Sequence, residues 1–148
     1  MLSLMWNVVP NFILSVILAI LGWLVFEFIG RPFRRFFDLR GEVAWRLVQF
    51  NNVFARVRWV RGTLEVIKLP ADEDVRLTEA QHIFRDLASR MKWFEQAEPF
   101  AVWFVSWRYD VSEASSALIA YSNEIATASE LRGHLKRNIE RVLRIRIN

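Results

Sequence analysis

Histidine, cysteine and carboxylate side chains are the residues most able to do chemistry, and this sequence offers few useful arrangements of them. It contains two histidines, His82 and His134, and no cysteine. His82 has one acid, Asp86, four residues later, which would share its face of a helix. Metal sites need three or four converging ligands, and such a lone pair is usually a solvated surface. The sequence therefore predicts no metal centre and no cofactor.

Residues for other kinds of catalysis also lack the spacing that their chemistry requires. No glycine-rich phosphate loop of the G-x-G-x-x-G or Walker type occurs. The acidic run at residues 71–76 resembles a calcium loop only superficially, because the turn glycine and the distal glutamate are missing. Spacing alone nominates no Ser/His/Asp set in a chain of this size. We therefore expect no catalytic residues and a protein that is not an enzyme.

The clearest pattern is an apolar run near the N-terminus. Residues 8–29 include only three strongly polar side chains, and in a helix they would span about 33 Å, close to the hydrocarbon thickness of a bilayer. The first 26 residues carry no charged side chain, so the positive region of a cleavable signal peptide is missing. The sequence predicts an uncleaved transmembrane anchor over residues 1–31.

Tryptophans and arginines mark where this anchor would meet the membrane interfaces. Trp6 and Trp23 lie 17 residues apart, about 25 Å along a helix, which suits the two headgroup levels. Arginines follow the apolar run and none precedes it, so the positive-inside rule predicts an inner-membrane protein with its N-terminus outside and its C-terminal part in the cytoplasm. The residues that we assign to the membrane interface are Trp6, Trp23, Glu27, Arg31, Arg34 and Arg35.

Glu27 is the one acid within the apolar run. Arg31 follows it by four residues, in the favourable order for a helical ion pair, so we expect the two to pair at the water boundary. The sharper alternative is an intramembrane proton site at Glu27. Gly30 and Pro32 then allow a bend where the chain leaves the bilayer.

One face of the anchor is small and slightly polar. Asn11, Ser15, Ala19 and Gly22 recur at steps of four, four and three residues. Small residues let a second helix approach closely, and asparagine or serine can donate hydrogen bonds across the contact. This face predicts a helix-packing site, and the alternative is an isolated anchor whose small residues fall together by chance.

The rest of the chain predicts an all-α fold, with a long juxtamembrane amphipathic helix over residues 32–58 and a small cytosolic helical domain over residues 59–148. The first turns of the amphipathic helix would lie on the membrane surface. For residues 59–77 we favour the end of that helix, irregular chain and an acidic loop. A minor β-hairpin near residues 56–69 is the alternative.

Helical periodicity is strongest over residues 79–96, where Thr78 would open a capping box. The apolar stretch 99–107 is too short to span a bilayer and predicts a buried helix, with Trp103 and Trp107 in the core, or else a strand. Two further helices are predicted, residues 113–127 capped by Ser112 and residues 130–146 capped by Ser129.

Charge is spread unevenly along the chain. Residues 31–61 carry a net charge of +6, residues 62–113 carry −4 and residues 114–148 carry +3. The segments either neutralise one another on folding or leave a basic surface that faces anionic lipid headgroups. Nucleic acid is the weakest of the predicted partners, because the positive-inside rule already explains the densest basic run.

Since no catalytic pattern is present, we expect the protein to act by binding. Trp45 and Trp93 lie off the apolar stripes of their helices, and tryptophan is a frequent interface anchor unless a helix of the same domain covers it. Arg137, Arg141 and Arg144 predict a basic ridge on the last helix. The favoured hypothesis is a single-pass accessory or assembly subunit of a larger membrane complex. The alternative is a self-associating tether that binds anionic lipid.

Overall fold

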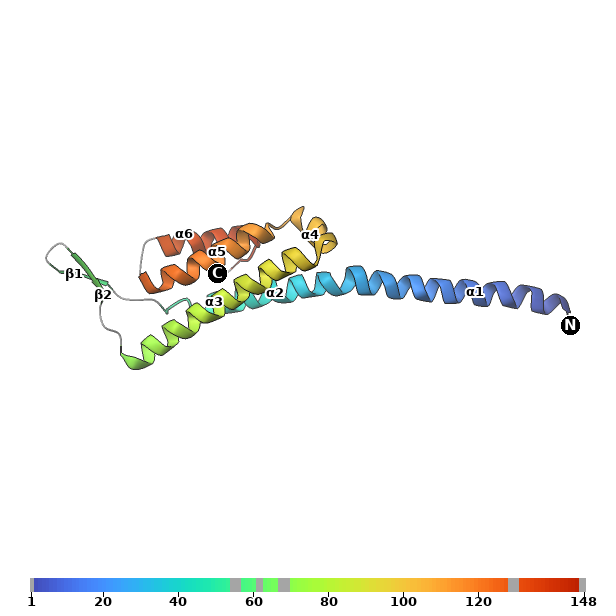
Figure 1. Ribbon diagram of the computed structural model, residues 1–148, viewed down its shortest axis with the longest axis horizontal. Helices are drawn as coiled ribbons and strands as arrows, with labels where there is room; N and C mark the ends of the chain where they lie inside the picture. Colours follow the sequence, from blue (N-terminus) through green and yellow to red (C-terminus); the bar gives the residue numbers. More distant parts are fainter. Residues whose placement is uncertain (1, 54–56, 61–62, 67–69, 128–130, 147–148) are drawn as a thin grey trace. The chain divides into compact units, whose positions relative to one another are not determined.

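The chain forms two compact units, Met1–Arg35 and Phe36–Asn148. Both consist mainly of helices (Figure 1), so the predicted helical fold class holds for the described residues, apart from one short hairpin. The computed structural model describes the backbone of residues 2–53, 57–60, 63–66, 70–127 and 131–146, and the side chains of residues 12–53, 70–125 and 131–146.

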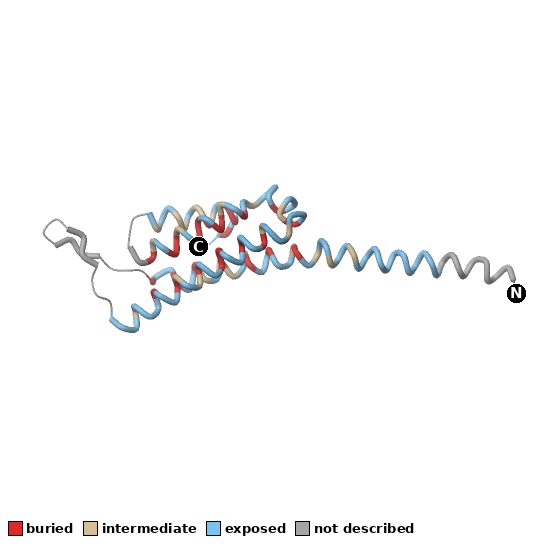
Figure 2. The backbone as a smooth tube through the Cα atoms, viewed as in Figure 1, coloured by how far each residue is buried: buried red, intermediate tan, exposed pale blue. Residues whose placement is uncertain are grey.

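The first unit is almost entirely one apolar helix. α1 spans Leu2–Val25, and a π-helical turn, η1 at Phe26–Gly30, separates it from α2, which begins at Arg31. Every residue from Phe12 to Trp23 is exposed (Figure 2). By length and composition, the described chain contains one helix that could cross a membrane, Phe12–Gln49.

The backbone stays helical past Gly30 and Pro32, the two residues that punctuate the sequence after the apolar run. In a regular α-helix a proline ring clashes with the carbonyl four residues earlier and removes one hydrogen bond. Here the amide of Arg31 donates to the carbonyl of Phe26, five residues back. This wider turn accommodates Pro32 where the sequence suggested only a bend.

Four of the described helices pack side by side in the second unit (Figure 1). α3 packs along α5, and α5 along α6. The ring of Phe36 in α2 contacts Phe94 of α3 and the ring of Phe50 contacts Phe84, so α2 and α3 run antiparallel. The bounds of these helices are Arg31–Gln49 for α2, Ala71–Ala97 for α3, Val111–Thr127 for α5 and Leu131–Val142 for α6.

Phe84 connects three helices in the core of the second unit. Its ring is fully buried and meets Tyr121 of α5 edge-on, with 5.0 Å between centroids. Phe50, the residue directly after α2, also contacts it edge-on, with 6.1 Å between centroids. Edge-to-face aromatic pairs contribute about 0.5–1.5 kcal/mol beyond the burial of their area, so this cluster holds α2 and α5 against α3.

α2 ends at Gln49, well before residue 58, and a hairpin follows it. β1 (Val57–Val60) pairs antiparallel with β2 (Thr63–Val66). The β-branched residues of these segments favour strands, and the two residues between them suit a hairpin. The prediction of irregular chain is therefore wrong here, and the alternative prediction of a minor hairpin is confirmed.

Asn51, two residues after the end of α2, is held by side chains of α6. The Asn51 carbonyl accepts a hydrogen bond from Arg132 Nη2 at 2.7 Å, and its side-chain oxygen accepts one from Lys136 Nζ at 2.7 Å. The end of α2 is thus bonded to α6 instead of continuing its own helix.

α3 begins at Ala71, eight residues earlier than predicted, and includes the acidic run. Asp72, Glu73 and Asp74 lie in its first turn, where the positive end of the helix dipole favours negative charge. Thr78 therefore lies inside the helix, and its hydroxyl donates to the Asp74 carbonyl at 3.1 Å. The predicted acidic loop and the capping box at Thr78 are wrong.

Asp110, not Ser112, caps α5. The amide of Glu113 donates to Asp110 Oδ1 at 2.8 Å, which satisfies one of the free amides at the start of the helix. The predicted body of this helix is otherwise correct, since Ala114, Leu118, Tyr121 and Ile125 are all buried. The predicted cap of the last helix, Ser129, lies outside the described residues.

α6 ends at Val142, four residues before the predicted end. Arg144 follows in the left-handed region, with φ 48°, and the Ile145 amide donates to the Glu140 carbonyl at 2.8 Å. This pattern closes a helix and is usually built on glycine. The guanidinium of Arg40 on α2 donates to the carbonyls of Leu143 and Arg144, each at 2.7 Å. The last turn is therefore fixed to α2.

Candidate membrane and interaction surfaces

The π turn carries the predicted ion pair between Glu27 and Arg31. The Arg31 guanidinium donates to Glu27 Oε1, so the pairing expected from their spacing is present. An added Cβ at Gly30 would lie 3.3 Å from the Phe26 ring, which shows how closely that ring approaches the backbone. The turn thus places one neutralised charge pair directly after a helix that has no charged side chain.

The small face predicted on α1 is open where its side chains are described. Ser15, Ala19 and Gly22 are all exposed, and a Cβ added to Gly22 would meet nothing within 4 Å. Trp23 is exposed as well. Two predicted residues of this helix, Trp6 and Asn11, lie in α1 with their side chains outside the described set.

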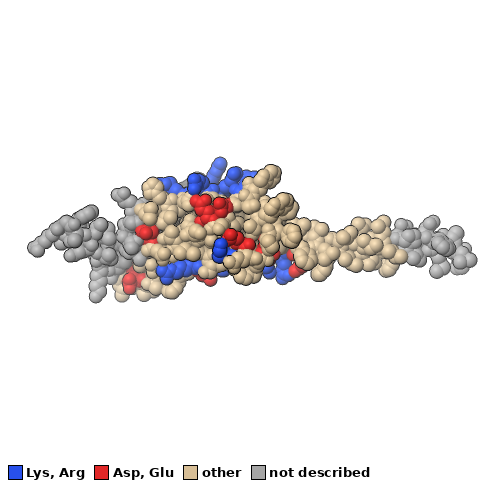
Figure 3. Space-filling model, turned by 45° about the horizontal axis from the view of Figure 1, so that its top comes forward, with Lys and Arg blue, Asp and Glu red and all other residues tan. Residues whose placement is uncertain are grey.

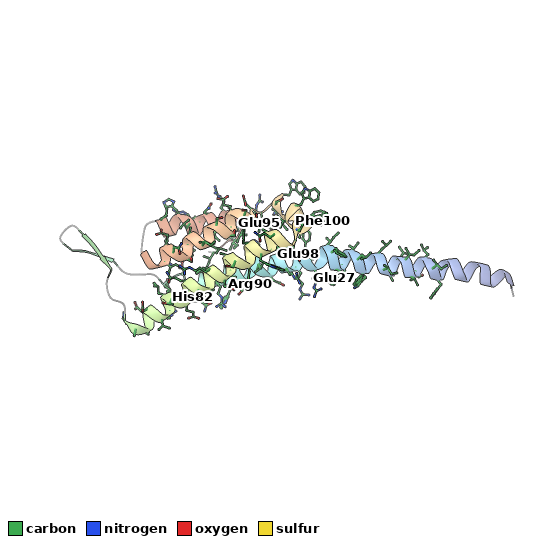
Figure 4. The ribbon with its side chains drawn as sticks, viewed as in Figure 1. Glu27, His82, Arg90, Glu95, Glu98 and Phe100 are labelled. Carbon is green, nitrogen blue, oxygen red and sulfur yellow. The ribbon has the colours of Figure 1, made fainter. Side chains whose placement is uncertain are left out.

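Trp45 and Trp93 lie on the outer faces of α2 and α3. Their side chains are 61% and 57% exposed, so no helix of the described domain covers them fully. Between these helices, Arg90 of α3 (labelled in Figure 4) donates to Glu42 of α2 at 2.8 Å. The two tryptophans therefore flank a polar seam and do not belong to the core.

The predicted basic ridge is only partly helical. Arg137 and Arg141 are exposed on α6, whereas Arg144 lies beyond its end. Arg141 is also partly neutralised, because it donates to Asn138 Oδ1 at 2.6 Å and lies 3.4 Å from Glu113 Oε1. Figure 3 shows lysine and arginine side chains along one edge of the molecule, with acidic side chains beside them.

α4, spanning Pro99–Ser106, and the residue after it carry a group of exposed aromatic side chains, and among the second-unit residues with described side chains these include the three most exposed large apolar ones. Of its residues, Ala101 and Val105 are buried against the domain. The exposed aromatic side chains of α4 and the residue after it, which we call the α4 aromatic patch, are Phe100 (78% exposed), Trp103 (70%), Phe104 (51%) and Trp107 (95%).

The prediction that Trp103 and Trp107 belong to the core is therefore wrong, although the predicted helix is present. The two residues that face the domain, Ala101 and Val105, are small and spaced by one helical turn. That spacing left the larger rings on the other faces. A helix that is apolar on every face is either buried or in contact with a non-aqueous phase. The sequence of α4 has this all-round apolar character, and that was the signal from which the patch could have been predicted.

The patch is hollowed between its rings. One open hollow of about 550 Å³ is lined by Trp103, Phe104, Ser106 and Trp107, and Phe100 helps to line a second of about 470 Å³. Trp103 and Phe104, which line both hollows, pack edge-on with 4.9 Å between ring centroids. The Phe100 side chain, at one end of the patch, is labelled in Figure 4.

The polar residues considered for chemistry do not converge. Asp86, the acid spaced from His82, lies 3.6 Å from Arg90 in an ion pair. Within the described part of the chain, no group of three or more histidine, aspartate or glutamate side chains is placed to hold a metal ion. No protein-family model matches this chain, and neither does any curated protein or any solved structure.

Proposed function

We propose that this protein is a single-pass inner-membrane protein whose helical domain acts by binding, as an accessory or assembly subunit of a larger membrane complex. The observation that carries the proposal is the exposure of α1. Every side chain from Phe12 to Trp23 is exposed, and monomeric soluble proteins rarely leave so long an apolar surface in water. A lipid bilayer would cover it along its whole length.

The charges after the helix support one orientation. Arg31, Arg34 and Arg35 are exposed and directly follow the apolar segment. Under the positive-inside rule they favour a cytoplasmic location for the second unit. The Glu27–Arg31 pair lies at the start of this basic segment. Pairing with Arg31 lowers the free-energy cost of placing the Glu27 carboxylate near the hydrocarbon.

The small face of α1 supports binding to a second membrane helix. Van der Waals contact drives helix association in lipid, and it is strongest where small residues let the backbones approach. Ala19 and Gly22 are exposed, and space around Gly22 is open. Trp45 and Trp93 give the second unit exposed aromatic side chains of its own for binding.

Crosslinking in native membranes tests this proposal. The full chain would be crosslinked, purified in mild detergent and compared with Gly22→Leu, which blocks the small face, and with Ile20→Leu, a volume-conserving control. We expect one membrane protein to crosslink to the unmodified chain and to Ile20→Leu, and to be lost with Gly22→Leu. A monomer with no crosslinked membrane protein contradicts the proposal.

The second candidate function is a self-associating tether that binds anionic lipid. Exposed Arg34, Arg35 and Arg137 favour it, because basic residues near a membrane contribute about 1 kcal/mol each toward anionic lipid. The same crosslinking experiment separates the two functions, since this one yields crosslinks between copies of the chain that persist without other proteins.

A further inference from the structure

The α4 aromatic patch is large for a soluble surface. Its four side chains expose most of their area, on the order of 600 Å² if each side chain offers about 150–250 Å². Single exposed apolar residues are normal, whereas contiguous patches of this size mark interaction sites. No charged residue interrupts it between Glu98 and Arg108.

The patch lies at the end of the second unit where the chain enters it. Phe36 is the first residue of that unit, and its ring lies 5.7 Å from Phe94 and 5.1 Å from Tyr109, between centroids. Phe94 precedes α4 and Tyr109 follows it, so the two contacts bracket the short helix.

This entry point is close to the end of the apolar segment. Phe36 follows Ile29 by seven residues, about 10 Å along a helix. The polar headgroup layer adds about 5–7 Å on each side of the hydrocarbon core. Because this connection is short, the end of the domain that carries α4 stays within reach of the surface of a bilayer that holds α1.

We propose that α4 is an interfacial helix whose aromatic patch enters the headgroup–acyl boundary of the same bilayer. This inference rests on the proposed membrane anchoring of α1. Tryptophan and phenylalanine are the side chains that favour this boundary, with the indole N–H of Trp103 and Trp107 able to donate to lipid carbonyls or water. The hollows between the rings have room for segments of acyl chain.

The covalent link to α1 explains how lipid could hold this patch. A short helix with four aromatic side chains has only modest affinity for a membrane on its own. The covalent link to α1 raises its effective concentration at the bilayer, so modest affinity suffices for stable contact. The patch would then act as a second attachment that fixes which face of the domain is presented to partners.

Single-cysteine variants test this directly, because the chain has no cysteine. The full-length variants Ser106→Cys, Thr78→Cys and Ile20→Cys would carry an environment-sensitive fluorophore in vesicles of phosphatidylcholine and phosphatidylglycerol, with and without spin-labelled lipid. Ser106 and Thr78 are matched, since both are exposed and both hydroxyls donate to a backbone carbonyl. Thr78 lies 19 residues before the end of α3, about 28 Å from the α4 end.

We expect the label at residue 106 to emit at shorter wavelength and to lose intensity with spin-labelled lipid, as the label at residue 20 does, while the label at residue 78 does neither. Trp103→Ser with Trp107→Ser should abolish the quenching at residue 106. Val75→Ser, which removes an exposed apolar side chain near the start of α3, should leave it unchanged. Unchanged circular dichroism in both variants would show that folding is intact.

The failures are distinguishable. Quenching at residue 20 without quenching at residue 106 overturns the interfacial role of α4 and leaves the anchor standing. No quenching at residue 20 overturns the anchor, and the inference with it. Equal quenching at residues 78 and 106 contradicts a specific role for α4. A label at residue 106 that emits at shorter wavelength only in native membranes, and not in lipid vesicles, also contradicts it and would indicate a protein partner.

Discussion

The side chain of Arg40 on α2 fixes the turn that follows α6. It donates to the carbonyls of both Leu143 and Arg144 and lies 5.5 Å from the centre of the Tyr109 ring. The two carbonyls that accept its hydrogen bonds are 103 and 104 residues away in the sequence, so no helical spacing could predict them. A basic residue on a polar face looks the same in the sequence whether it caps a distant helix or faces water.

We expect Arg40→Ala to lower the free energy of unfolding of the domain by about 1–3 kcal/mol, because two carbonyls lose charge-assisted hydrogen bonds. Urea denaturation of the full chain in detergent, followed by tryptophan fluorescence, measures this. Arg40→Lys is the matched control and should retain part of the stability, since an ammonium can reach one carbonyl. Equal stability of Arg40→Ala and the unmodified chain would show that water replaces both bonds.

The elements were predicted well where a stripe of apolar residues repeats over many turns. Met91, Ala88, Phe84 and Ala80 follow the core face of α3, and all are buried as their period requires. The ends were predicted poorly, because a helix end depends on single hydrogen bonds. Thr78 and Gln81 have capping-box spacing, yet the three acids before them extend the helix through its dipole.

The start of α5 provides a test of this difference. We expect Asp110→Ala to cost about 1 kcal/mol of domain stability, because the Glu113 amide loses its acceptor. Ser112→Ala should change stability by less than about 0.5 kcal/mol, since its side chain lies inside the first turn and is exposed. Chemical denaturation of the two variants measures both losses of stability. A larger loss in Ser112→Ala than in Asp110→Ala would support Ser112 as the cap, as the sequence predicted.

The π turn before Pro32 makes a prediction about backbone geometry. In Pro32→Ala the amide at residue 32 could donate to the Phe28 carbonyl, so η1 should relax to α-helix. Hydrogen exchange by NMR would then show a protected amide at residue 32. Pro99→Ala is the control, because Pro99 opens α4, where a first-turn amide has no helical partner. Rapid exchange at residue 32 would mean that something other than Pro32 sets the turn.

At the scale of the whole molecule, the sequence predicted the existence of the apolar helix but not the second apolar surface. The apolar helix is evident in the sequence because only three of the 22 residues from 8 to 29 are strongly polar. The α4 aromatic patch is not, because eight residues of similar character can be buried or exposed, and only the packing of Ala101 and Val105 decides which. Whether a side chain is buried depends on which other elements pack against it. A segment of eight residues does not determine which elements those are.

The orientation of the molecule is the prediction on which its partners depend. Arg31, Arg34 and Arg35 should keep the second unit in the cytoplasm, so Thr78→Cys in intact cells should resist a membrane-impermeant maleimide and react after lysis. Ser3→Cys should react in intact cells. Reversing the three arginines to glutamate should weaken or invert this pattern, because the positive-inside bias is then lost. Labelling of Thr78→Cys in intact cells would place the domain outside, where a cytoplasmic complex could not bind Trp45 or Trp93.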